Sequence, residues 1–317
     1  MNFIQQAYKG ENSFGRYVLS FFLILIGWQV IGITPLAYVA YLKAGSLDSL
    51  LQSSINSFMD LGIDSNVFFF LMLLSFVGGF IFLLLSIKYI HKRAIKTLVT
   101  SRKKVDWKRV FYGFTLWLSI SLFLLSIDYF MNPENYVWNF QPIPFFTLVV
   151  ISLFILPFQT SFEELLFRGY FMQGLGILFR NAAAPLIITS VVFGLLHGAN
   201  PEVEKLGSMI MIYYIGTGFL FGITTLMDKG TELSLGMHAA NNMVAAIFVT
   251  MNWTVFQTEA LYVDISEPEV GIELFLPVFV IYPLVLFIFS KKYGWSNWKQ
   301  KLFGKLENPI QNNRYEN

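Results

Sequence analysis

Apolar residues in this chain occur in long unbroken runs rather than in the alternating or one-faced patterns of soluble proteins. A helix needs about 20 such residues to cross the hydrocarbon core of a bilayer, which is roughly 30 Å thick. Eight runs approach that length: approximately 17–42, 67–87, 110–131, 143–162, 182–199, 206–227, 233–254 and 273–290. The pattern therefore predicts an all-α membrane protein, a multi-pass bundle of about eight transmembrane helices in the cell membrane.

Two stretches need interpretation beyond their hydropathy. The first run is about 26 residues long, which exceeds the 7–15 apolar residues of a removable signal peptide, so we expect it to remain as an anchor. The stretch 164–180 is largely apolar but contains Arg168, Arg180 and three glycines. We interpret it either as a continuation of the fourth span or as an interfacial helix.

The basic residues indicate the orientation of the bundle. With the N-terminus inside, every Lys and Arg except Lys43 and Lys205 falls in an inner segment, whereas the loop 255–273 is acidic. Because basic residues near span ends are retained in the cytoplasm, both termini are expected there. The net charge of +2 is too small to suggest nucleic acid as a partner.

The segment 91–109, HKRAIKTLVTSRKKVDWKR, contains the densest basic run. It is interpreted as a stop-transfer cluster that fixes topology and lies on anionic lipid; a regulatory or headgroup-binding patch is the alternative. His91 lies within this run, and we assign it no chemistry.

Composition narrows the classes of function. Hydrophobic residues make up 55% of the 317 positions and charged residues only 13%, whereas soluble proteins carry roughly 25% charged residues, so a soluble enzyme is excluded. The chain has no cysteine, which excludes disulfides, thiol catalysis and cysteine-bound metal. Any nucleophile or metal ligand must come from His, carboxylate or hydroxyl groups, and there are only three histidines.

Charged residues within the apolar runs form the first candidate site. A charge at the centre of a span costs about 2.5–3.5 kcal/mol on insertion scales, so persistent ones usually have a function. Glu164 and Arg168 are i,i+4 neighbours on a helix and can pair, while Glu163 is turned about 100° away and remains available as a base. The alternative is a capping box, Ser161-x-x-Glu164, at an ordinary helix start.

Two further clusters carry the histidines that lie at membrane depth. Phe193-Gly-Leu-Leu-His197 ends one apolar run, and Phe193 is interpreted as packing around the pocket wall. His238-Ala-Ala-Asn-Asn242 begins another, with His238 and Asn242 on one helix face. A lone histidine on an apolar helix is more often a packing residue, but two of three histidines together with a Glu pair indicate a site.

These groups support hydrolysis by activated water. A glutamate in a poorly solvated pocket can take a proton from water and return it to a leaving amine. A histidine can orient that water, and a second histidine with an amide can donate hydrogen bonds to an oxyanion. Alternatively, Glu163, His197 and His238 can serve as ligands of a zinc ion. The cofactor is therefore either none or a divalent metal such as zinc.

The three motifs Glu-Glu-x-x-x-Arg, Phe-x-x-x-His and His-x-x-x-Asn, in this order, resemble those of the CPBP family of membrane proteases, also called Abi. That family comprises CAAX prenyl endopeptidases and bacteriocin-processing or bacteriocin-immunity proteins. The match covers about residues 145–250. The resemblance implies an all-helical fold of about eight spans, with the site in a cavity open toward the cytoplasmic side.

The resemblance also implies roles for individual residues. Glu163 would be the catalytic base, His197 would help to activate the water, and the third motif would line the oxyanion site. The second Glu and the Arg of the first motif would support it. Metal-dependent and glutamate-based mechanisms are both ascribed to the family. The residues carried over as catalytic are Glu163, Glu164, Arg168, His197, His238 and Asn242.

The expected organisation has three parts. Residues 1–142 hold three transmembrane helices and the basic cytoplasmic loop, residues 143–255 the catalytic core, and residues 256–317 the last helix and a basic tail. The leading function is an intramembrane endopeptidase that acts on a peptide or membrane-associated protein, with membrane lipid as its surroundings. The alternatives are a catalytically silent immunity or scaffold protein and, less favoured, a proton-coupled transporter.

This assignment makes a geometric demand. Glu163, His197 and His238 must meet around one water molecule. The fourth span must therefore continue past Glu163 through roughly Tyr170, kinked at Pro157, and the fifth span must lie low in the membrane.

Overall fold

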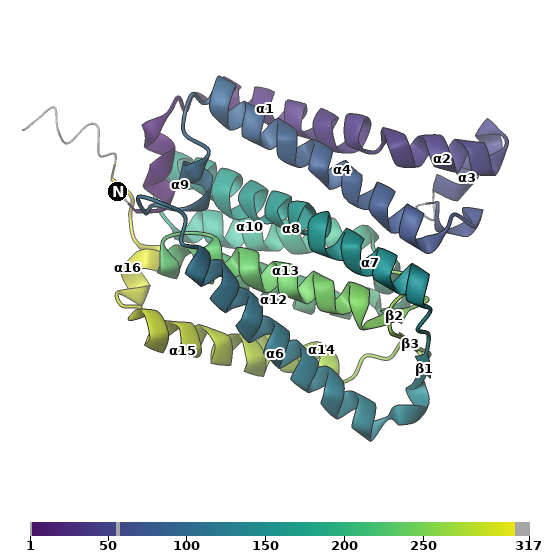
Figure 1. Ribbon diagram of the computed structural model, residues 1–317. Helices are drawn as coiled ribbons and strands as arrows, with labels where there is room; N and C mark the ends of the chain where they lie inside the picture. Colours follow the sequence, from purple (N-terminus) through teal and green to yellow (C-terminus); the bar gives the residue numbers. More distant parts are fainter. Residues whose placement is uncertain (1, 55–57, 308–317) are drawn as a thin grey trace, which may run out of the picture.

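The computed structural model describes residues 2–54 and 58–307, and it is mainly helical (Figure 1). The long helices lie side by side in one bundle, and a small sheet lies at one end of it. The helices are α1 (Phe14–Ile26), α2 (Thr34–Ala44), α3 (Leu47–Ser54), α4 (Ser65–Leu85), α5 (Lys96–Val99), α6 (Trp107–Met131), α7 (Pro142–Phe154), α8 (Leu156–Glu164), α9 (Met172–Phe179), α10 (Ala183–Leu196), α11 (Pro201–Leu206), α12 (Met211–Asp228), α13 (Glu232–Ile247), α14 (Ile272–Leu276), α15 (Tyr282–Tyr293) and α16 (Trp298–Phe303). The strands are β1 (Tyr136–Trp138), β2 (Val249–Met251) and β3 (Tyr262–Asp264).

Several of these helices join into longer apolar rods. Six rods in the described part of the chain are long and apolar enough to cross a membrane, and a seventh apolar helix, Ala183–Ala199, is shorter. α13 has only 16 residues. The expected all-α, multi-pass membrane fold is confirmed. The six rods are Phe14–Ala44, Ser65–Ile90, Trp107–Met131, Pro142–Phe179, Pro201–Asp228 and Leu274–Tyr293.

The expected span 233–254 is wrong at its C-terminal end. α13 ends at Ile247, and β2 follows it, parallel to β3, which in turn pairs antiparallel with β1. Polar residues alternate along this segment at Thr250, Asn252 and Thr254, which suits a strand and not an apolar helix. The hydropathy window merged a short helix with a strand.

The fourth rod, Pro142–Phe179, extends past Glu163. Its helix has a local break at Ile155, two residues before Pro157, because proline lacks the N–H that would continue the helical hydrogen bonds. It then widens into a π-helical turn at Leu165–Phe171. The continuation of this span is confirmed, and the readings of 164–180 as an interfacial helix and of Ser161 as a helix start are wrong.

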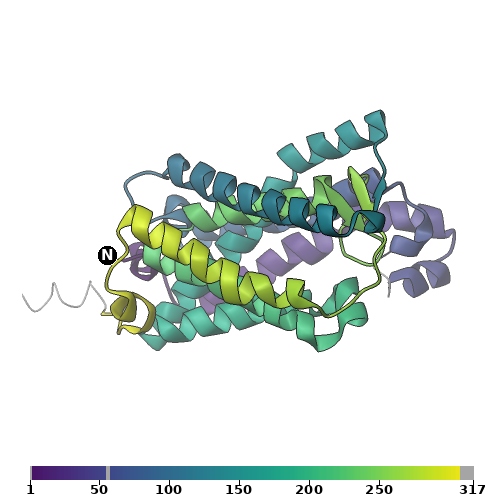
Figure 2. The same cartoon turned by 90° about the horizontal axis from the view of Figure 1, so that it is seen from below.

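The bundle has two chemically different ends, seen in Figures 1 and 2 as the end with the N-terminus and α16 and the end with the strands. Apart from Lys43, Lys205 and the buried Arg168, the described Lys and Arg residues lie at or near the first, which we call the basic end. The basic end consists of the N-terminal segment 2–13, the loop 91–106, the turns 180–182 and 229–231, and the segment 294–307. The other end, which we call the acidic end, consists of the connecting segments 45–54, 58–64, 132–141, 197–210 and 248–271.

Close helix packing aligns the polar side chains of the bundle. α6 and α13 approach until a Cβ built on Gly236 would lie 2.0 Å from the carbonyl oxygen of Val110, and one on Gly113 would lie 2.4 Å from that of Leu233. Only glycine permits this contact. It brings Trp117 of α6 within hydrogen-bonding distance of Asn241 on α13.

Candidate active site

The charged motif of the fourth rod forms a buried ion pair, as its spacing predicts. Arg168 Nη1 donates to Glu164 Oε1 at 2.9 Å, and both side chains are fully buried. Arg168 also donates through Nη2 to the carbonyl of Gly218 at 3.2 Å, and its guanidinium lies 4.3 Å from the ring centroid of Phe193. Glu164 and Arg168 are therefore fixed within the protein.

His238 connects the two adjacent glutamates. Its Nδ1 lies 2.9 Å from Glu164 Oε1, and its Nε2 lies 3.6 Å from Glu163 Oε2. The ring stacks on Phe221 with a centroid distance of 5.1 Å. His238, rather than His197, is thus the imidazole beside Glu163.

Hydrogen-bonding chemistry determines which nitrogen carries the proton in the neutral form of the His238 ring. A carboxylate oxygen that already accepts from Arg168 can only accept, so His238 Nδ1 must carry a proton. In the neutral imidazole, Nε2 is then an acceptor that faces Glu163 Oε2. That oxygen is buried and has no hydrogen-bond partner among the described residues. Two acceptors 3.6 Å apart need a donor, and one water molecule can donate to both.

His197 lies on another wall. Its Nδ1 donates to the carbonyl of Phe193 at 2.8 Å because a carbonyl can only accept, which leaves Nε2 as an acceptor in the neutral ring. The ring stacks on Tyr214 at 4.5 Å. Phe193 lies between the two imidazoles, with its centroid 4.9 Å from that of His197 and 6.1 Å from that of His238. Within the described chain, no hydrogen bond joins His197 to Glu163.

A chain of side-chain hydrogen bonds leads to Glu163 from α6. Trp117 Nε1 donates to Asn241 Oδ1 at 3.2 Å, Asn241 donates to Asn242 at 3.1 Å, and Asn242 donates to Gln159 at 3.0 Å. Gln159 Nε2 then donates to Glu163 Oε1 at 2.6 Å. An indole can only donate and a carboxylate can only accept, so the direction of every amide between them is fixed.

Three members of this relay, Trp117, Gln159 and Asn241, were not expected from the sequence. Gln159 lies one helical turn before Glu163, and that i,i+4 spacing could have revealed it. Asn241 adjoins Asn242, but only the packing of α6 against α13 gives it a partner. Asn242 uses one of its two amide hydrogens on Gln159, which leaves the second available.

These groups line a single cavity of about 350 Å³. Glu163, His197, His238 and Asn242 all contribute to its wall, and Phe193 packs in the wall as expected. Glu164 and Arg168 lie behind it, fully buried. The structure thus brings together the residues that the three motifs singled out, with Glu163 only 9% exposed.

The zinc alternative requires Glu163, His197 and His238 to converge. Among the described residues, no group of three or more His, Asp or Glu side chains is gathered closely enough to hold a metal ion. The donor set in this conformation therefore does not fit the expected zinc site.

Comparison with known proteins agrees with the fold and with the position of the site. The family model described as type II CAAX prenyl endopeptidase Rce1-like matches residues 142–244, which include all six motif residues. "Uncharacterized protein YyaK" of Bacillus subtilis (strain 168) is 31% identical over 259 residues, which cover 81% of this chain and 85% of that protein. No solved structure matches the chain significantly.

A multi-pass membrane bundle with these motifs around one cavity is the fold of CAAX-protease-like intramembrane proteins. The chain belongs to the CPBP family.

Proposed function

We propose that this protein is an intramembrane endopeptidase that hydrolyses a peptide bond with a water molecule held between Glu163 and His238. The observation that carries the proposal is the unpartnered Glu163 Oε2, which faces the acceptor Nε2 of His238 at 3.6 Å in the cavity wall. A water that donates both hydrogens to these atoms keeps its lone pairs directed toward a substrate carbonyl.

The reaction follows from these positions. Glu163 takes a proton from the water while the water oxygen forms a bond to the carbonyl carbon. The carbon–nitrogen bond then breaks, and the same proton passes to the leaving amine. Gln159 holds the other oxygen of the Glu163 carboxylate, so the reactive oxygen stays directed at the water.

The remaining groups supply electrostatic stabilisation. The second amide hydrogen of Asn242 is available to the oxyanion of the tetrahedral intermediate, and such donors act strongly where water is scarce. Arg168 neutralises Glu164, so Glu163 is the uncompensated carboxylate beside His238. The acceptor Nε2 of His197 can bind a substrate N–H at the far wall.

The arrangement of the site and the fold of the family are the observations that support this function. A catalytically silent scaffold would use the same cavity to bind a peptide, and it would need its shape but not the Glu163 carboxylate. Replacement of that carboxylate therefore separates the two functions.

The test compares membranes that contain the wild type with membranes that contain Glu163→Gln, by quantitative proteomics of peptide termini. We expect at least one new terminus that only the wild type produces. Glu204→Gln is the matched control, because Glu204 is an exposed carboxylate outside the cavity. Identical termini in all three membranes, with equal amounts of folded protein, would contradict the peptidase proposal.

Metal dependence needs a separate measurement. The substrate identified by the proteomic comparison is incubated with the purified wild type before and after treatment with a metal chelator. The metal content of the protein is measured by elemental analysis. We expect activity to survive chelation. Loss of activity that is restored by added zinc would replace the glutamate mechanism with the metal-dependent one.

A further inference from the structure

The cavity extends from Glu163 and His238 toward only one end of the bundle. Apart from α8, which contributes Gln159 and Glu163, the long helices that line it contribute their middle or the part nearer the acidic end. α4 contributes the segment 72–76 from its middle, α12 contributes 213–221, and α13 contributes 238–245. Of the described residues in the wall, none belongs to a loop or turn of the basic end.

The outer rim of the cavity is built from loops of the acidic end. The segment 249–256 and residues Asn200 and Glu202 line it. Glu202 is buried and accepts hydrogen bonds from Tyr214, from Asn200 at 3.1 Å and from the backbone N–H of Val255 at 3.0 Å. These bonds hold the rim in place, while Ala245 on the inner wall remains exposed.

The opposite direction is closed close to the catalytic groups. Glu164 and Arg168 form the layer beneath Glu163, and both are fully buried. Thr225 and Ser234, which also have no exposed surface, come next toward the basic end and hydrogen-bond to each other at 3.3 Å.

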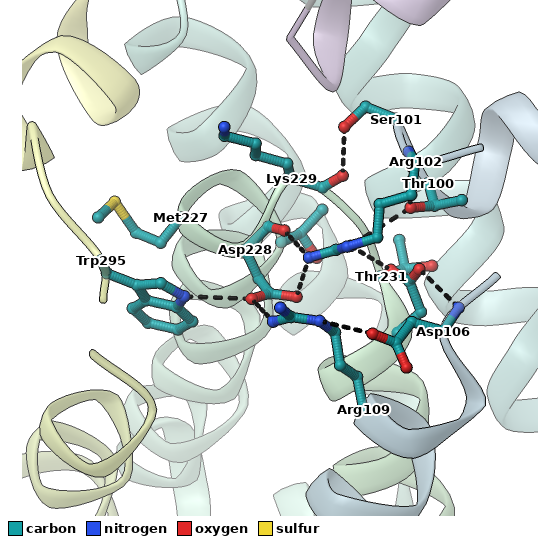
Figure 3. Close-up of polar contacts among 12 residues, drawn as sticks. Thr100, Ser101, Arg102, Asp106, Arg109, Met227, Asp228, Lys229, Thr231 and Trp295 are labelled. Carbon is teal, nitrogen blue, oxygen red and sulfur yellow. Dashed lines mark hydrogen bonds and ion pairs between the residues drawn. The ribbon is translucent and has the colours of Figure 1, made fainter. Parts of the chain in front are cut away.

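Beyond this layer an ion-pair cluster closes the basic end. Figure 3 shows Arg102 and Arg109, from the loop and the start of α6, pointing toward Asp228 at the end of α12. Arg102 pairs with Asp228 at 2.9 Å and with Glu232 at 3.1 Å, Arg109 pairs with Asp228, and Trp295 donates to Asp228 at 3.1 Å. We call these five residues the basic-end plug.

The plug also ties together segments far apart in the sequence. Ser101 N–H donates to the carbonyl of Lys229 at 3.1 Å, and Thr231 N–H donates to that of Val99 at 2.8 Å. Arg93, which donates to Gln173 at 2.6 Å, makes a similar internal contact. Arg93, Arg102 and Arg109, which we expected to lie on anionic lipid and fix topology, therefore bind other side chains of the protein. A peptide could enter from this end only after these contacts separate.

Charge then assigns the two ends to the two sides of the membrane. Basic residues accumulate on the cytoplasmic side of membrane proteins, so the plug faces the cytoplasm and the open end of the cavity faces away from it. We propose that the site is reached from the extracytoplasmic side and that its substrate is an exported or outward-facing polypeptide. The existence of a substrate rests on the proposed peptidase function, whereas the side from which the cavity is reached does not.

The walls specify what part of such a polypeptide enters. Met72, Phe76, Val249, Met251 and Phe256 make most of the cavity apolar. A segment with apolar side chains next to the cleaved bond fits this lining, because its burial is favourable at about 25 cal/mol per Å². The cytoplasmic opening implied by the family resemblance does not agree with this geometry.

The test uses the absence of cysteine from the natural chain. Ala245→Cys and, as a second cavity position, Val249→Cys introduce single thiols into the wall. Glu134→Cys marks the acidic end and Lys104→Cys the basic end, both at exposed positions. Intact cells and inverted membrane vesicles are treated with a small, charged methanethiosulfonate reagent that does not cross membranes, and unreacted thiols are counted after denaturation.

We expect the two cavity thiols and Glu134→Cys to react in intact cells, and Lys104→Cys to react only in inverted vesicles. Cavity thiols that react only in inverted vesicles, or from neither side, overturn the proposal. Reversed labelling of the two end markers overturns it as well. The readout needs no catalysis, so the Glu163→Gln comparison can succeed while this inference fails, or the reverse.

Discussion

Two buried clusters in this protein contain the same kinds of groups but differ in how completely they are paired. In the basic-end plug all four carboxylate oxygens have partners: those of Asp228 bond to Arg102, Arg109 and Trp295, and those of Glu232 to Arg102 and to the backbone N–H of Asp106. At the cavity, by contrast, one oxygen of Glu163 in the wall and one of Glu164 behind it have no hydrogen-bond partner in the described chain.

This difference in pairing indicates that the plug is a structural cluster and that the cavity cluster is a reactive one. An unpaired buried polar atom costs about 1–3 kcal/mol, so a site that keeps one is less stable than it could be. Functional sites commonly retain such a cost because the free valence is needed for substrate or water. Within the described chain the plug has no unpartnered carboxylate oxygen, so we expect its residues to determine stability and the cavity residues to determine turnover.

The largest expected effect is that of Glu163→Gln on turnover. Loss of a general base typically lowers the rate by about 10²–10⁴-fold. Since the substitution removes a buried charge with an unpartnered oxygen, the thermal unfolding midpoint in detergent should stay the same or rise. A variant that loses activity and stability together would place Glu163 with the structural cluster instead.

Asp228→Asn is the matched change in the plug, and it should have the opposite signature. Removal of one partner from a buried ion pair leaves the others uncompensated and costs about 3 kcal/mol. Arg102 and Arg109 are then left without their common carboxylate. The unfolding midpoint should fall clearly, while the turnover number of the folded fraction stays near that of the wild type. Unchanged stability would show that the plug does not hold the basic end together.

Acidification should also lower the free energy of unfolding, through His91 at the basic end. His91 is fully buried and bonded to the carbonyl of Glu11 at 2.8 Å and to Tyr170. Burial, aided by the charges of Arg93 and Arg16, lowers the pKa of His91 to about 4. The unfolded value is about 6.5, so stability is full above that pH and falls as the pH drops toward 4, because only the unfolded chain binds the proton.

Between pH 6.5 and 5 this linkage amounts to about 2 kcal/mol. Unfolding midpoints of the wild type and of His91→Gln are measured across that interval. The wild type should lose stability more steeply than the variant, which has no titrating ring. Parallel curves would show that other groups are responsible for the acid sensitivity.

The smallest effect concerns the relay that positions Glu163. Gln159→Leu removes the bond to Glu163 Oε1, and a hydrogen bond to a charged group is worth enough for a roughly tenfold loss in kcat. KM should change little, because Gln159 orients the base and does not bind the peptide. Trp117→Phe removes only the far end of the relay and should cost less. A Gln159→Leu enzyme with full kcat would show that the relay has no positioning role.

The sequence predicted what depends on local spacing and missed what depends on packing. The Glu164–Arg168 pair follows from i,i+4 geometry, and it is present at 2.9 Å. The approach of His238 to Glu163 depends on how α8 packs against α13, which no local pattern encodes. The resemblance implied that His197 helps to activate the water, whereas the structure places His238 beside Glu163.

The same reason explains the errors at the ends of the bundle. Hydropathy gave eight runs, but it could not show that Val249–Met251 pairs with a strand over ten residues later. Charge counting correctly recognised 91–109 as a basic segment at one end. It could not show that Arg102 and Arg109 turn inward, because their partners Asp228 and Glu232 lie more than 100 positions away.

The shortness of α13 bears on how this site is hydrated. Its 16 residues span about 24 Å, less than the roughly 30 Å of hydrocarbon that surrounds the bundle. The chain beyond Ile247 therefore leaves the helix below the membrane surface, and irregular backbone at that depth is tolerated only where it is shielded or lines an aqueous space. We therefore expect the loop that follows α13 to line an aqueous opening of the cavity, through which water for the proposed hydrolysis can reach the site without crossing lipid.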